Sequence, residues 1–398
     1  MAKEKKKKLI YQNVYFWIIT GGVFFITIFY STDLNNLLIQ NVSYKSVDVA
    51  PITPTKIVEE KKETVSTVAP LDKDLYDKKM KELANIPPPK EPKPIIVTKK
   101  VVDKKTGKTT IQKTTLPGKP IVQKPSPWPV ATVYPNAGAI LPFSRIVAFY
   151  GNLYSKKMGA LGEYPEDEML AKLNGEVKKW EKADPTTPAI PALHYIAVTA
   201  QGDGGADGKY RARMPESEIN KILKMAEKDH AIVFLDVQVG LSTLQAELPL
   251  LEKYLKLPNV HLGIDPEFSM KDGTKPGHKV GTFSAADINY AAEFLARIVK
   301  ENNLTPKVFI VHRWTQNMVT DYKNIKPLPD VQIVMDMDGW GVQAKKFSTY
   351  NSFIYPEPVQ FTGFKLFYKN DIKTPGTTLL TPEQVLKLSP RPIYIQYQ

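Results

Sequence analysis

The chain has 398 residues, of which 42% are hydrophobic, and it contains no cysteine. This length suffices for one large domain with additional segments, and the lack of cysteine excludes disulfides, thiolate metal sites and a cysteine nucleophile. The formal net charge is +13, but basic and acidic residues nearly balance from Ala131 onward, so the excess lies in the N-terminal third. A C-terminal module without a basic surplus argues against nucleic-acid binding, and we expect no nucleic-acid partner.

The N-terminus has the pattern of a membrane anchor. Residues 1–8 form a lysine-rich tail, and residues 9–30 form an apolar run without a charged side chain. About 20 helical residues span a bilayer core, and Tyr11, Trp17 and Tyr30 lie near the ends of the run, where interfacial aromatic residues gather. We expect a single-pass helix in the lipid bilayer of the cell membrane, with the N-terminus in the cytoplasm and the rest outside. A cleaved signal peptide is the alternative, but no A-x-A-like cleavage site follows the run.

Residues 31–135 are rich in Lys, Pro and Thr, and we expect them to form an extended stalk outside the membrane. Proline removes backbone donors, and repulsion between like charges favours extension. Within this stretch, Leu71, Leu75 and Leu83 indicate a short helix over 71–86. The lysines are expected to solvate a tether, and attraction to an anionic envelope polymer or to lipid headgroups is the alternative.

The remaining residues, 136–398, alternate apolar strand-like runs with helical patterns. We predict strands over 145–151, 192–202, 231–240, 260–268, 307–314, 331–341, 363–371 and 392–398. The runs are almost continuously apolar, as in strands that are buried on both faces. Eight such units in about 250 residues predict an α/β fold, the (β/α)8 TIM barrel. An open doubly wound sheet is the alternative, but the turn after the first strand lacks a G-x-G-x-x-G motif.

Polar side chains gather at the predicted carboxyl ends of the strands, where the active residues of such barrels lie. Four acids are expected to be catalytic: Glu267, Asp265, Asp338 and Asp236. The candidates for substrate binding are Tyr150, Gln238, His312, Arg313, Asp336, Trp340, Tyr394 and Gln396. Strand residues two apart point the same way, so we expect Asp265 and Glu267 to face the barrel mouth together.

Converging carboxylates raise one another's pKa, which keeps a proton donor protonated near neutral pH. That chemistry suits glycoside hydrolysis, which needs a donor to the leaving oxygen and a second carboxylate. The acids therefore favour a hydrolase acting on an envelope or external polysaccharide, with the strand-four Glu267 as general acid.

A resemblance agrees with this interpretation. The stretch GIDPE at 263–267 resembles the end of the D-x-x-D-x-D-x-E signature of family-18 glycoside hydrolases, the chitinase-like barrels, and MDMDGWG at 335–341 resembles their M-x-Y-D motif. The resemblance implies that Glu267 is the proton donor, that Asp265 orients a substrate N-acetyl group or supports Glu267, and that Asp338 assists at the sugar. It also implies a mechanism in which the substrate's acetamido group is the nucleophile.

The chain is also similar to secreted bacterial barrels without an assigned activity, and two other functions stay open. One is a non-catalytic barrel that binds glycan or an envelope partner, in which the strand-end acids only cap helices. The other is a metal-dependent hydrolase that uses His312 and the acids as ligands. Such barrels usually carry paired histidines on early strands, and His194 is expected at the start of the second strand, away from the mouth. We therefore expect no metal and no cofactor.

Overall fold

The computed structural model describes residues 69–398, with short gaps at 89–93, 103–104, 106, 108 and 118–124. The lysine-rich tail and the membrane helix predicted over 9–30 lie outside these residues. Among the described residues, no helix is both long and apolar enough to cross a membrane.

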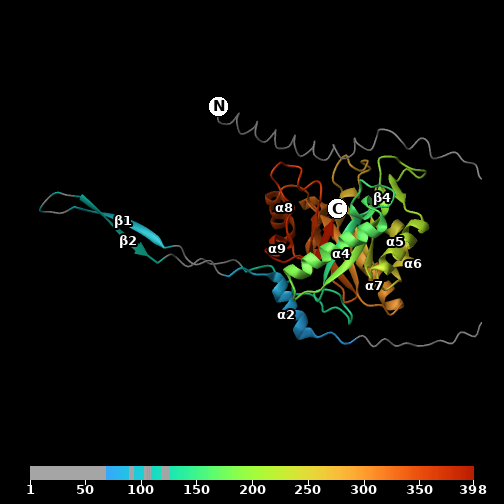
Figure 1. Cartoon of the computed structure of the whole chain (residues 1–398), viewed down its shortest axis with the longest axis horizontal. Coiled ribbons are helices and arrows are strands. Elements are labelled where there is room, and N and C mark those ends of the chain that lie inside the picture. Colours follow the sequence, from blue (N-terminus) through green and yellow to red (C-terminus); the bar gives the residue numbers. More distant parts are fainter. Residues whose placement is uncertain (1–68, 89–93, 103–104, 106, 108, 118–124) are drawn as a thin grey trace, which may run out of the picture.

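Eight parallel strands form a closed barrel, which confirms the predicted α/β fold (Figure 1). The strands are β3 (Arg145–Gly151), β4 (Ala189–Ala200), β6 (Ile232–Val237), β7 (Val260–Ile264), β9 (Lys307–Arg313), β11 (Val331–Met337), β12 (Phe361–Leu366) and β13 (Tyr394–Tyr397). Each strand pairs with the next along the chain, and β13 pairs with β3 to close the circle. Nearly every strand residue is buried, because helices cover the outside and side chains fill the inside.

The helices that follow the strands pack on the outside of the barrel. They are α3 (Ala160–Glu163), α4 (Glu166–Ala183), α5 (Glu216–Lys228), α6 (Leu244–Leu255), α7 (Ala285–Glu301), α8 (Gln343–Thr349) with the π-turn η5 (Tyr350–Ile354), and α9 (Pro382–Val385). Between β9 and β11, a stretch described throughout, no α-helix occurs, and the helical turns there are the 3-10 turns η3 (Gln316–Met318) and η4 (Tyr322–Asn324). Three short strands lie outside the eight-stranded barrel. β5 (Arg211–Arg213) pairs with β4 in antiparallel fashion, and β8 (Phe283–Ser284) pairs with β10 (Val319–Thr320) in parallel fashion.

The helix predicted over 71–86 exists, but it belongs with the barrel and not with an extended stalk. This helix, α2 (Lys73–Ala84), begins after an Asp72 cap. Its Tyr76 and Met80 are 3% and 6% exposed and pack in the same apolar cluster as Ile146 and other residues from the first halves of the strands. Figure 1 shows α2 at one end of the barrel. The helix therefore closes the amino-terminal end, where the open barrel would otherwise expose apolar side chains to water.

Part of the predicted stalk also forms a regular element. Strands β1 (Ile95–Val102) and β2 (Thr109–Leu116) pair in antiparallel fashion, and their described side chains are exposed.

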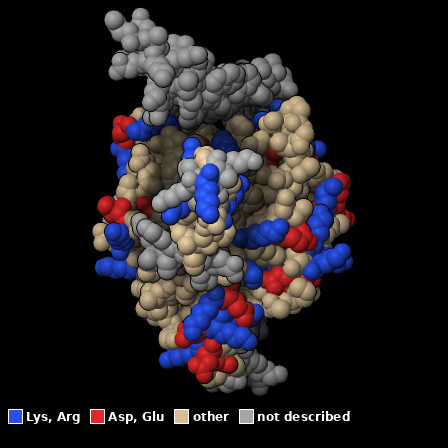
Figure 2. All heavy atoms as spheres, turned by 90° about the vertical axis from the view of Figure 1, so that its left-hand side faces the viewer, with Lys and Arg blue, Asp and Glu red and all other residues tan. Residues whose placement is uncertain are grey.

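Basic and acidic side chains are interspersed over the molecular face drawn in Figure 2.

The α2 contact generates a prediction for stability. Met80→Ala removes a buried side chain from the closed end, so we expect the free energy of unfolding to fall by about 2–4 kcal/mol. Lys78→Ala, on the exposed face of the same helix, is the control and should change it by less than about 0.5 kcal/mol. Urea unfolding of the purified protein measures both, and equal midpoints for the two variants would contradict the packing of α2.

Candidate functional site

Charged side chains lie inside the carboxyl-terminal half of the barrel. Asp236 on β6, His312 on β9, Asp336 on β11 and Lys365 on β12 are at most 2% exposed. Alternation along each strand turns these residues towards the barrel axis. A barrel interior is normally filled by apolar side chains. Four charged side chains buried at this end are therefore unusual and mark it as the candidate site.

His312 is the centre of this cluster. Its Nε2 lies 3.6 Å from Oδ1 of Asp236, and its Nδ1 lies 3.3 Å from Oδ2 of both Asp336 and Asp338. Lys365 Nζ lies 2.9 Å from Oδ1 of Asp338. Asp336 and Asp338 therefore contact the same imidazole nitrogen, and positive and negative charges alternate along the chain of contacts.

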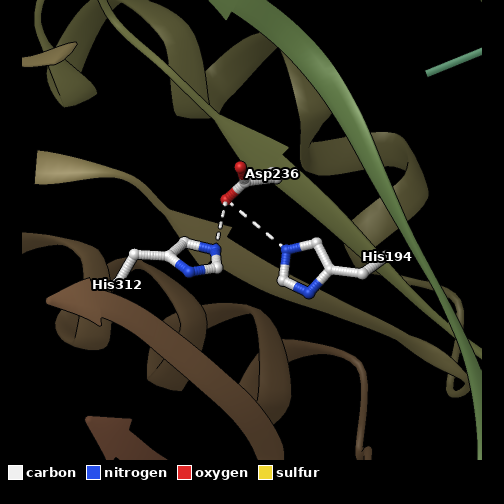
Figure 3. A group of neighbouring side chains, drawn as sticks. All are labelled: His194, Asp236 and His312. Carbon is white, nitrogen blue, oxygen red and sulfur yellow. Dashed lines mark ion pairs between the residues drawn. The ribbon is translucent and has the colours of Figure 1, made fainter. Parts of the chain in front are cut away.

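His194 belongs to the same cluster, contrary to its expected place at the far end of the barrel. Strand β4 begins at Ala189 and not at 192, so His194 lies well inside the strand. Its Nε2 is 3.5 Å from Oδ1 of Asp236 (Figure 3). Its Nδ1 hydrogen-bonds with the hydroxyl of Tyr394 and lies 3.1 Å from Nε2 of Gln396. Tyr394 and Gln396 are fully buried. They therefore orient His194 and do not line an open surface, where they were expected to bind substrate.

Two glycines make room for the cluster. A Cβ atom at Gly263 on β7 would lie 2.4 Å from Nε2 of His194 and 2.6 Å from Oδ1 of Asp236. A Cβ atom at Gly363 on β12 would lie 2.5 Å from an oxygen of Asp336. These positions cannot accept a side chain unless the cluster moves. Lys365 is not among the residues expected from the sequence. A glycine within an apolar strand and the lone lysine in GFKLFY are the signals that could have indicated an occupied polar interior.

A second set of hydrogen bonds links the buried cluster to the mouth. Tyr150 donates its hydroxyl proton to Oδ2 of Asp236 at 2.9 Å. The amide nitrogen of Gln238 lies 3.3 Å from the hydroxyl oxygen of Tyr150 and donates to Oδ2 of Asp265 at 3.3 Å. All four residues are candidates from the sequence, and the structure brings them together.

Glu267 and Asp265 lie just beyond β7, not on it. The strand ends at Ile264, and the 3-10 turn η2 (Pro266–Phe268) follows. Asp265 caps this turn, because its Oδ1 accepts the backbone N–H of Glu267 at 3.0 Å. The expectation that the two acids share one strand face was therefore wrong. Glu267 is half-buried, and its Oε2 accepts the indole N–H of Trp314 at 3.0 Å.

The protonation states follow from burial and neighbouring charge. Burial raises the pKa of Glu267 to about 7, against the Trp314 hydrogen bond and with the help of the Asp338 charge. Burial also raises the pKa of Asp265 well above its usual value. Burial acts on Asp338 in the same direction, but Lys365 and His312 together outweigh it and lower that pKa. Below about pH 7 the site therefore holds a protonated Glu267 and an ionised Asp338.

Arg313 and Trp340 lie apart from the cluster. Arg313 follows His312 on β9, so its side chain points to the opposite face. There its Nη1 pairs with Oε2 of Glu357 at 2.6 Å, and other nitrogens donate to loop carbonyls. Trp340 is a half-buried rim residue, and Lys345 lies 4.8 Å from the centroid of its ring.

No family model matches the chain, and no curated protein is significantly similar to it. Among solved structures, a cellulase is 14% identical over 56% of this chain and 65% of its own length, with a TM-score of 0.33. A mannanase from Bacillus subtilis is 11% identical over 65% of this chain and 81% of its own length, also with a TM-score of 0.33. A sugar phosphate isomerase/epimerase from Parabacteroides distasonis is 11% identical over 66% of this chain and 88% of its own length, with a TM-score of 0.29. At such scores these likenesses carry no argument about activity, so the function is argued from the site.

The pKa of Glu267 generates a prediction for stability. Because folding raises this pKa from 4.5 to about 7, the folded state binds the proton more tightly, and the stabilisation is lost as pH rises through about 7. Glu267→Gln cannot lose a proton there. We expect the variant to become more stable than the parent between pH 5 and 8, by at most about 3 kcal/mol. Thermal or urea unfolding across this range measures the difference, and a difference that does not depend on pH would contradict the raised pKa.

Proposed function

We propose that the barrel is a glycan hydrolase and that Glu267 is its general acid. The observation that carries this proposal is a half-buried carboxyl at the barrel mouth whose pKa of about 7 keeps it protonated near neutrality. A general acid works best when its pKa lies near the working pH. The indole N–H of Trp314 fixes one carboxyl oxygen, which leaves the other oxygen to carry the proton towards a leaving group.

Asp338 is the proposed second carboxylate. Lys365 and His312 hold it ionised, and its side chain is 8% exposed, so it reaches the surface that Glu267 borders. An ionised carboxylate stabilises the positive charge that develops at the sugar carbon while the acid protonates the leaving oxygen. Trp314, which bonds to Glu267, and Phe268, which follows Glu267 in η2, are half-buried, as is Trp340 two residues after Asp338. Such aromatic faces can pack against sugar rings.

The resemblance to family-18 glycoside hydrolases assigns the same roles to Glu267 and Asp338, and it suggests a substrate that carries N-acetyl groups. In that mechanism Asp265, which accepts from the Gln238 amide, orients the acetamido group. Val260 and Gly263 stand where the family signature has its first two aspartates, and Gly263 here gives space to His194. The proposal is therefore a glycan-acting barrel, with N-acetylated envelope glycans as the first substrates to test.

The proposed location rests on the N-terminal sequence. The uncharged run at 9–30 follows a lysine-rich tail, a pattern that favours a single-pass membrane helix with the tail in the cytoplasm. We propose that this helix tethers the barrel outside the membrane, within reach of envelope polysaccharide.

A non-catalytic glycan-binding barrel is the second candidate, and burial is the observation that favours it. Asp236, Asp336 and His312 are fully buried, so a ligand at the surface reaches only Glu267, Asp338 and the surrounding aromatic residues. Such a protein binds glycans without cleaving them.

Hydrolysis of a panel of N-acetylated and plain glycans distinguishes the two functions. For an enzyme, we expect Glu267→Gln to lower kcat/KM by about 10²–10⁴-fold, because the amide keeps the shape but has no acidic proton. Glu293→Gln, an exposed change on α7, is the control and should leave the rate unchanged. No turnover by the folded parent, with equal glycan binding by the parent and Glu267→Gln, would instead establish the binding module.

The pH profile belongs to the same experiment. The rate should fall as pH rises through about 7, because Glu267 then loses its proton. Trp314→Phe removes a hydrogen bond that favours the ionised form of Glu267, so the pKa of Glu267 should rise. The rate of this variant should therefore fall at a higher pH than the rate of the parent. If the rates of the parent and of Trp314→Phe fall at the same pH, a group other than Glu267 controls the rate.

A further inference from the structure

Three side chains bring metal-binding atoms together in the barrel interior. Nε2 of His194, Oδ1 of Asp236 and Nε2 of His312 all lie within 4.8 Å of one another. The two nitrogens are 3.5 and 3.6 Å from the carboxylate oxygen. In a tetrahedral zinc site with bonds of about 2.0–2.1 Å, neighbouring ligand atoms lie about 3.4 Å apart. We propose that His194, Asp236 and His312 form a binding site for a divalent transition-metal ion.

The three atoms are poorly satisfied by the protein itself. All three residues are 0% exposed, and these atoms have no hydrogen-bond partner among the described residues. A buried polar atom without a partner costs about 1–3 kcal/mol. Here three such atoms point to one place, as Figure 3 shows. A cation at that place would satisfy all of them at once.

Polar groups also surround the other polar atom of each ligand, as is usual around metal-binding histidines. For His312, Nδ1 lies 3.3 Å from carboxylate oxygens of both Asp336 and Asp338, which favour a proton on Nδ1 and leave Nε2 for the ion. For Asp236, Oδ2 accepts the hydroxyl proton of Tyr150.

The third ligand is held in the same way. Nδ1 of His194 is bonded to the hydroxyl of Tyr394, which in turn accepts from Nε2 of Gln396 at 2.7 Å. In the tautomer that donates its Nδ1 proton to Tyr394, His194 also presents a free nitrogen at Nε2. These outer contacts orient all three ligand atoms before an ion arrives.

Gly263 supplies the space beside the proposed ion. Its missing Cβ would come within 2.6 Å of both the His194 nitrogen and the Asp236 oxygen. Of the three carboxylates that contact His312, Asp338 is the one whose side chain is partly exposed, at 8%.

Two imidazoles and one carboxylate select a transition metal such as Zn²⁺ over Mg²⁺ or Ca²⁺, which prefer oxygen ligands. With three protein ligands, such a site keeps a position for water or substrate. Bound there, the ion replaces the proton on Nε2 of His312 and keeps positive charge between the carboxylates. The site goes beyond the proposed function, because the role of Glu267 as proton donor does not require the ion.

Metal titration of the full chain tests this site without any substrate. After chelator treatment and dialysis, we expect the parent to bind one Zn²⁺ per chain by calorimetry and elemental analysis, with a raised thermal midpoint, and Mg²⁺ to produce neither effect. Asp236→Asn and His194→Ala each remove one ligand and should weaken zinc binding at least 100-fold. His278→Ala removes a rim-loop histidine outside the cluster and should bind as the parent does.

Two further variants keep the test decisive if the ligand changes impair folding. Tyr394→Phe removes only the hydroxyl that orients His194, so zinc affinity should fall about 10–100-fold. Gly263→Ala fills the space beside the ligand atoms and should lower zinc affinity while circular dichroism stays unchanged. The proposal is overturned if the folded parent binds no zinc, or if Asp236→Asn and Tyr394→Phe bind it as tightly as the parent.

Discussion

The compensation of charge around His312 is the interaction on which the site depends. This buried imidazole lies between Asp236 on one side and Asp336 and Asp338 on the other. Burial lowers its pKa, but the surrounding carboxylates raise it well above its usual value. A charge inside a protein is stable only when it is paired, and Lys365 together with this positive centre holds Asp338 ionised. That negative charge in turn helps burial to keep Glu267 protonated. A proposed metal ion would take over the same positive role.

The two ends of the barrel interior serve different purposes. The amino-terminal half is mostly apolar, and α2 closes it with Tyr76 and Met80. The carboxyl-terminal half carries the polar network, which is held from β13 and from the residues just beyond β6. A rigid apolar base allows the network to keep fixed distances, and a fixed arrangement of charges is what general acid catalysis and metal binding both require. Only Glu267, Asp338 and the surrounding aromatic residues then reach the surface.

Apolar runs and their alternation with helices predicted the eight strands, because strands buried on both faces leave a strong local pattern. The same reasoning placed Asp236, His312 and Asp338 at the carboxyl ends of strands, although Asp236 and His312 are fully buried below the mouth. It could not place His194, because its depth depends on where β4 begins and on how the barrel closes. It misjudged Arg313, since neighbouring strand residues point to opposite faces, and Asp265, since β7 ends at Ile264, one residue before it. The packing of α2 joins segments far apart in the chain, which local sequence does not reveal.

The protonation of Glu267 is the claim that connects the buried charges to a proposed chemistry. Carbon-13 NMR of the Glu267 carboxyl, titrated from pH 4 to 9 in the presence of a chelator, measures it directly in the parent and in Asp338→Asn. The account predicts a pKa of about 7 in the parent and a lower value in the variant, because the variant lacks the negative charge of Asp338. A parent pKa near the usual 4.5, unchanged in Asp338→Asn, would contradict it.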